Sequence, residues 1–103
     1  MCNQINKRFD KLEINNINKQ EIVYSDGTKY IGQVVNGLAE GNGIRYWNNG
    51  DRYEGERRNG KFEGKGMLYF NNGDRRMGDY YNDKPIGKHV RLTKNGDVKI
   101  ENY

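Results

Sequence analysis

The placement of glycine constrains this 103-residue chain more than any other feature of its sequence. All 14 glycines fall into five columns of a 23-residue period. The first column holds Gly27, Gly50, Gly73 and Gly96, and the other columns lie five, ten, fourteen and sixteen residues further on. Flexible glycine-rich linkers have no fixed phase, whereas a fixed period in this size range is typical of a repeat protein. The chain is therefore expected to fold as a stack of similar units.

Aromatic residues and Asn-Gly pairs follow the same period. The repeated aromatic positions are Tyr30 and Tyr53, Tyr46 and Tyr69, and Trp47 and Phe70. An Asn-Gly pair between two aromatic-rich, alternating runs predicts a β-hairpin, because both residues accept the positive φ of a type I′ turn. Each period is thus expected to be one hairpin. Glycine inside a strand is expected where an aromatic ring from a neighbouring hairpin lies flat on bare backbone.

Composition favours a small aromatic core. Hydrophobic residues make up 33% of the chain and charged residues 31%, which approaches the composition of a disordered segment. The eight tyrosines favour a folded chain, because each large ring can bury about 150–250 Å² while its hydroxyl remains hydrated. A chain this short and polar forms one small domain and cannot also enclose a deep catalytic cavity.

Two segments carry the period in its clearest form. They are YIGQVVNGLAEGNGIRYWNNG at residues 30–50 and YEGERRNGKFEGKGMLYFNNG at residues 53–73. Both resemble the MORN repeat (membrane occupation and recognition nexus), whose consensus runs Tyr-x-Gly-x-x-x-x-Gly, then Gly-x-Gly, an aromatic pair and a closing glycine. The resemblance implies an all-β fold, a short single-layer ribbon of stacked 23-residue antiparallel β-hairpins within residues 21–103.

The repeats are expected at about residues 27–49, 50–72 and 73–95, with a C-terminal cap strand at 96–103. The third copy is degenerate, because Arg76 replaces its tyrosine and His89 one of its glycines. Since a repeat stack needs terminal units that do not invite further stacking, these changes are interpreted as cap substitutions, with no further role for His89.

Residues 1–20 do not follow the period. Ile5, Phe9 and Leu12 share one helical stripe, so either a short amphipathic helix within residues 4–14 or an unstructured arm is expected. The segment lacks the apolar stretch of a secretory signal, and no run in the chain approaches the roughly 20 apolar residues of a membrane span. A lone Cys2 fits a reducing compartment. The expected location is the cytoplasm.

Catalytic chemistry has little support. His89 is the only histidine, and no serine or cysteine nucleophile lies near a base. Asp51, Asp74 and Asp97 follow the turn glycines, where aspartate is expected to hydrogen-bond locally. We therefore expect no enzyme activity, no cofactor and no metal site.

Binding is the remaining function class, and two sets of side chains are candidates for it. The predicted partner-binding groove consists of Tyr30, Tyr46, Trp47, Tyr53, Tyr69 and Phe70. Some of these rings must form the core, and strand alternation places the two members of each adjacent pair on opposite faces. The predicted contacts for an anionic ligand are Lys29, Arg52, Arg57, Arg58 and Arg75, although acidic neighbours such as Glu54 and Glu56 reduce the net field.

The resemblance implies a protein–protein interaction or scaffold module, a subunit of a larger cytoskeletal, ciliary or membrane-associated assembly. Two alternatives remain open, a module that binds phosphoinositide or another anionic membrane, and an accessory domain of an enzyme complex. Protein partners are expected to bind more tightly than anionic lipid. No nucleic acid is expected, because the chain lacks the motif of a known nucleic-acid reader. A homodimer is left open.

Overall fold

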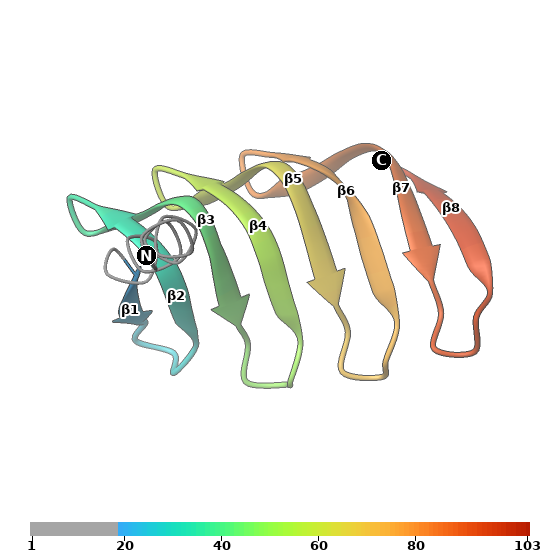
Figure 1. Cartoon of the computed structure of the whole chain (residues 1–103), viewed down its shortest axis with the longest axis horizontal. Helices are drawn as coiled ribbons and strands as arrows, with labels where there is room; N and C mark the ends of the chain where they lie inside the picture. Colours follow the sequence, from blue (N-terminus) through green and yellow to red (C-terminus); the bar gives the residue numbers. More distant parts are fainter. Residues whose placement is uncertain (1–18) are drawn as a thin grey trace, which may run out of the picture.

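The computed structural model describes residues 19–103, which form one open antiparallel sheet of eight strands in chain order (Figure 1). The strands are β1 (Lys19–Val23), β2 (Lys29–Val35), β3 (Leu38–Tyr46), β4 (Arg52–Arg58), β5 (Lys61–Tyr69), β6 (Arg75–Tyr81), β7 (Lys84–Leu92) and β8 (Val98–Asn102). The predicted all-β ribbon of stacked hairpins is confirmed. The helix or arm was predicted for residues 1–20, of which residues 1–18 lie outside the described residues, while Lys19 and Gln20 belong to β1. Residues 19–103 contain no helix suited to crossing a membrane.

Tight two-residue turns join β2 to β3 and β4 to β5. Asn36 and Gly37 have φ values of 53° and 79°, the left-handed pair that a type I′ turn requires. The third hairpin keeps this geometry with Asn82 and Asp83, at φ values of 55° and 72°. Asparagine and aspartate tolerate this region better than other side chains, so the turn persists without its glycine.

The turns between hairpins are longer than the type I′ turns predicted for their Asn-Gly pairs. Gly50 donates its backbone N–H to the Trp47 carbonyl, and Trp47 donates to the Asp51 carbonyl, at 3.1 and 3.0 Å. Within this turn only Gly50 has a positive φ, so Asn49 does not take the type I′ geometry predicted for the Asn-Gly pair. A type I turn followed by one left-handed glycine is the usual alternative in hairpins of this length.

These turns also hydrogen-bond to one another along the ribbon. The Asp51 carboxylate accepts the backbone N–H of Asn71 at 2.8 Å, and the Asp74 carboxylate accepts that of Lys94 at 3.0 Å. Local capping instead comes from Asn49, whose side chain accepts the Asp51 N–H at 3.0 Å. Asp51 also makes the predicted local bond, since its carboxylate accepts the side-chain amide N–H of Asn49 at 3.3 Å. The bonds from Asp51 and Asp74 to the next turn were not predicted, and they form because that turn lies within reach of both carboxylates.

Each long hairpin contains a register shift near its middle, the first between Gly32 and Val34. Gly41 lies opposite this shift with a φ of 75°, which a residue with a Cβ rarely adopts. Such a bulge bends a strand and increases its twist. The upper parts of the hairpins in Figure 1 accordingly curl away from the line of the lower strands.

Tyrosine rings pack against bare backbone on one face of the sheet, which we call the inner face. A Cβ added at Gly43 would collide with the ring of Tyr30, and one at Gly66 would collide with the ring of Tyr53. Ring and glycine belong to the same hairpin, not to neighbouring hairpins as predicted. Both tyrosines are completely buried, and they form the centre of the core.

The third hairpin fills the same space from the opposite strand. His89 on β7 is completely buried, and a Cβ added at Gly78 on β6 would collide with its ring. The His89 ring makes edge contacts with Tyr80 and Tyr103, at centroid distances of 5.2 and 5.0 Å. The expectation that His89 has no role was therefore wrong, since its ring replaces the tyrosine ring lost at Arg76.

Candidate functional site

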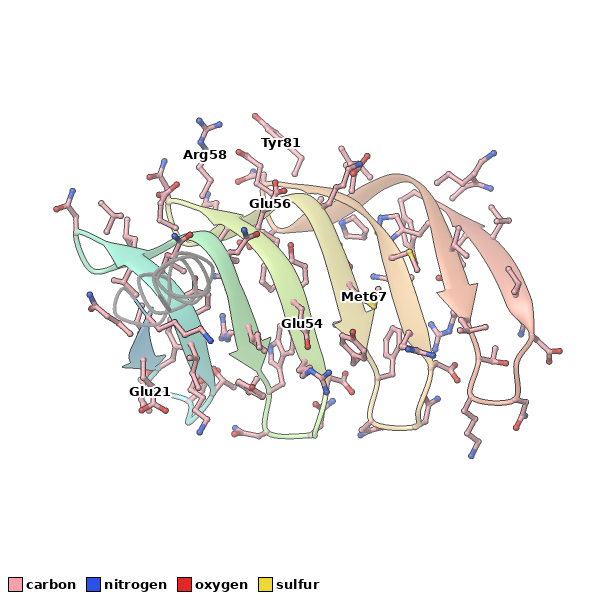
Figure 2. The ribbon with its side chains drawn as sticks, in the orientation of Figure 1. Glu21, Glu54, Glu56, Arg58, Met67 and Tyr81 are labelled. Carbon is pink, nitrogen blue, oxygen red and sulfur yellow. The ribbon has the colours of Figure 1, made fainter. Side chains whose placement is uncertain are left out.

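Two rows of side chains cross the face opposite the buried tyrosines, which we call the outer face. The apolar row contains Glu21, Ile31, Ile44, Glu54, Met67, Met77, Val90 and Ile100, one residue from each strand. The basic–aromatic row beside it contains Val23, Lys29, Tyr46, Arg52, Tyr69, Arg75, Leu92 and Val98. Figure 2 labels three members of the apolar row, Glu21, Glu54 and Met67. Cross-strand pairing at one register thus builds a continuous surface from residues that lie far apart in the sequence.

Cations and tyrosines alternate in the basic–aromatic row. The Arg52 guanidinium lies 3.9 Å from the centre of the Tyr69 ring, and the Lys29 ammonium lies 5.8 Å from that of Tyr46. Both distances allow cation–π attraction. The alternation therefore holds the Arg52 and Lys29 side chains against an aromatic neighbour.

Glutamates of the apolar row neutralise two of these cations. Arg52 donates to the Glu54 carboxylate at 2.9 Å, and this hydrogen bond raises the pKa of Arg52. Lys29 lies 3.5 Å from the Glu21 carboxylate. Arg75 is exposed and forms no ion pair within residues 19–103. The charge available to a ligand on this row is therefore centred on Arg75.

The six predicted groove aromatics do not lie in one groove. Tyr30 and Tyr53 are buried, and burial raises the pKa of both hydroxyls. Trp47 and Phe70 lie on the inner face, where Arg45 and Arg91 stack on their rings at 5.5 and 4.1 Å. The aromatics that reach the outer face are Tyr46 and Tyr69. The two members of each adjacent pair thus lie on opposite faces, as strand alternation predicts.

The five predicted cations also separate. Lys29, Arg52 and Arg75 share one row, as their 23-residue spacing suggests. Arg58 lies at the exposed upper end of β4, 3.4 Å from Glu63 (Figure 2). Arg57 is 4% exposed and lies between the rings of Tyr30 and Phe62, so it belongs to the core. Burial lowers the pKa of Arg57.

The apolar row was missed by sequence reasoning, although the period contains it. Ile31, Met77 and Ile100 occupy one 23-residue column, and Ile44, Met67 and Val90 occupy another. A shallow hollow of about 380 Å³ opens in this row, lined by Glu54, Lys65, Gly66, Met67, Met77, Gly78 and Asp79. Its lining contains no serine, cysteine or histidine, and no group within residues 19–103 could hold a metal ion through three or more His, Cys, Asp or Glu side chains. The surface offers apolar and ionic contacts to a binding partner.

Comparison with known families agrees with this repeat geometry. The MORN repeat family model matches residues 30–52 and 53–75. Each match starts at a buried tyrosine, runs through one hairpin and ends at the first residue of the next hairpin. No curated protein matches the chain in a sequence search. MORN repeats form a non-catalytic module associated with protein or membrane interaction. The chain therefore contains two MORN repeats, at residues 30–52 and 53–75.

Proposed function

We propose that this chain is a protein–protein interaction or scaffold module, a subunit of a larger cytoskeletal, ciliary or membrane-associated assembly. The outer face carries this proposal. Its apolar side chains include Met77, Val98 and Ile100, which are 47%, 66% and 53% exposed. Sheets normally bury their apolar face against a second layer, and within residues 19–103 no second layer covers this one. A contiguous exposed apolar surface is typical of an interaction site.

Tyr46 and Tyr69 add to this surface. Tyrosine and arginine are enriched among the residues that contribute most to binding energy at interfaces. Here Arg52 pairs with Tyr69, so the two side chains are ordered before a partner arrives. Prior ordering reduces the entropy lost on association.

Affinity capture from source cells tests the proposal. The full chain is compared with Met77→Asp, which puts a charge into the apolar row, and with Val35→Asp as the matched control. Val35 is 52% exposed, similar to Met77, but it lies near the hairpin tip, away from both rows. Partners that Met77→Asp loses and Val35→Asp retains would support the proposal. Equal retention by both variants would contradict it.

Binding to anionic membrane is the second candidate, favoured by the alignment of Lys29, Arg52 and Arg75 in one row. A well-placed cation contributes about 1 kcal/mol near an anionic surface. Because Glu21 and Glu54 pair with two of the three cations, weak and salt-sensitive association is expected. Liposome sedimentation with phosphoinositide at physiological salt is the test. Tight retention that is lost in Arg52→Glu and Arg75→Glu would rank the membrane above a protein partner.

A further inference from the structure

The outer face of β5–β8 carries an uninterrupted apolar surface, which we call the C-terminal patch. It consists of Met67, Met77, Val90, Leu92, Val98 and Ile100, drawn from the two outer-face rows. On β1–β4 the apolar row is interrupted by Glu21 and Glu54. The two halves of the outer face therefore differ in what they can bind.

Charges around the C-terminal patch are mainly positive. The charged outer-face side chains beside the patch are Lys65, Arg75, Lys88 and Asp79, while Lys61, Glu63 and Lys84 of the same strands lie nearer the hairpin tips. Lys65 and Asp79 lie 3.6 Å apart and neutralise each other. Arg75 and Lys88 are exposed and form no ion pair within residues 19–103. A partner that covers the patch gains most if it brings carboxylates to these two cations.

We propose that the C-terminal patch binds an amphipathic helix that has an apolar stripe and acidic flanks. This inference rests on the proposed interaction function and specifies the chemistry of the partner. The apolar stripe covers the methionines and the aliphatic side chains, while the flanking carboxylates reach Arg75 and Lys88. A second copy of the chain would instead bring the same two cations toward each other.

The spacing of the strands suits a helix. Neighbouring strands lie about 4.8 Å apart, close to the helical pitch of about 5.4 Å. A helix that crosses β5–β8 can therefore place one apolar side chain over each strand. An extended segment presents same-side residues about 6.6 Å apart, which is out of step with the row.

The hollow offers an anchor point for the helix. Met67 and Met77 face each other across β5 and β6, and the backbone of Gly66 and Gly78 lies beside them. The same two glycines contact the Tyr53 and His89 rings on the inner face, and on the outer face their backbone forms part of the lining of the hollow. Methionine side chains adapt to the shape of the group that they contact. One large apolar side chain of the helix would insert here.

The test uses a synthetic 18-residue helix with leucines at i, i+3, i+4 and i+7 spacing and glutamates on both flanks. A matched peptide carries lysine at each glutamate position. Binding to the full chain is measured by fluorescence anisotropy at low and physiological salt. The acidic helix is expected to bind, and the affinity of the basic helix is expected to be at least about tenfold lower. A tenfold ratio corresponds to about 1.4 kcal/mol of binding free energy.

Three variants locate the binding surface. Met77→Asp is expected to lower the affinity for the acidic helix by about tenfold. Arg75→Glu is expected to lower this affinity most at low salt, where charges are least screened. Val23→Asp, on the same face of β1 and 66% exposed before substitution, is the matched control and should leave affinity unchanged.

Equal binding of the acidic and basic peptides, no binding of either, or equal losses in Val23→Asp and Met77→Asp would each overturn the proposal. Vesicles of phosphatidylcholine and phosphatidylserine form a separate arm. If these vesicles bind the chain but not Met77→Asp, and the acidic helix does not bind, the patch is a membrane-binding surface. If cellular capture depends on Met77 but no peptide binds, the interaction function stands and the helix inference fails.

Discussion

The imidazole ring of His89 lies against the backbone of Gly78 on the facing strand, in the space that a tyrosine ring fills in each of the two preceding hairpins. Tyr30 and Tyr53 reach this space from the first strand of their hairpin, whereas His89 reaches it from the second. The two departures from the repeat, at positions 76 and 89, therefore compensate each other. A hairpin that looks degraded in sequence retains a packed ring.

This exchange predicts strong coupling between Arg76 and His89. His89→Gly removes a buried ring and should cost about 2–4 kcal/mol of unfolding free energy. Arg76→Tyr alone should also destabilise, because its ring competes with His89 for one space. The double variant restores the tyrosine–glycine arrangement of the other hairpins. Denaturant unfolding of the four proteins measures the coupling, and strictly additive losses would contradict the exchange.

Gly55→Val tests the close approach of backbone and ring in the best-preserved hairpin. A Cβ at Gly55 would lie 2.6 Å from the Lys65 carbonyl oxygen and 2.7 Å from the Gly66 Cα, so the two strands would have to separate. A loss of more than about 1 kcal/mol is expected on thermal or denaturant unfolding.

Gly37→Asn is the control for Gly55→Val. No atom lies within 4 Å of a Cβ at Gly37, and asparagine tolerates the φ of 79° there. It should change stability little. If the two variants unfold alike, contact between strand and ring is not the reason for the glycine at position 55.

The fold could be predicted because its determinants are local and repeated. Asn36 and Gly37 encode a turn by themselves, and the 23-residue period fixes where each strand begins. Which face becomes the core could not be read in this way. In a single-layer sheet the core is formed by Tyr30 and Tyr53, while Met77 remains half exposed, so burial does not follow hydropathy.

The candidate site was only partly predictable for the same reason. The common row of Lys29, Arg52 and Arg75 follows directly from their spacing. The burial of Arg57 does not, because it depends on how the bulge near Gly55 turns the strand toward Phe62. Alternation separates faces, but it carries no information on which face the sheet curls around.

Asp74 predicts how stability depends on pH. Its carboxylate accepts the Lys94 N–H and two Arg91 N–H groups, at 3.0, 3.1 and 2.9 Å. The Lys94 bond first, and then Arg91, lower the pKa of Asp74. A carboxyl whose pKa is lower in the folded state stabilises the fold above its unfolded pKa, and that stability is lost as pH falls through the folded value.

Asp74→Asn should therefore unfold more easily than wild type at neutral pH, and the difference should shrink as the medium becomes acidic. Thermal unfolding across this pH range provides the measurement. Asp97→Asn is the control, because Asp97 occupies the same column and its carboxylate makes no hydrogen bond within residues 19–103. A constant difference between wild type and Asp74→Asn at all pH values would contradict the role assigned to this carboxylate.

Arg57 and Arg58 are neighbours with opposite environments, so charge reversal should separate them. Arg57 is 4% exposed and packs on Phe62 at 4.5 Å, whereas the Arg58 side chain is 71% exposed. Arg57→Glu buries an unpaired carboxylate and should cost about 3 kcal/mol or more. Arg58→Glu should change stability by no more than about 0.5 kcal/mol, as is usual for surface positions. Unfolding of both variants measures this difference. Similar stabilities would mean that the Arg57 guanidinium reaches solvent, and Arg57 would then return to the set of candidate contacts for an anionic ligand.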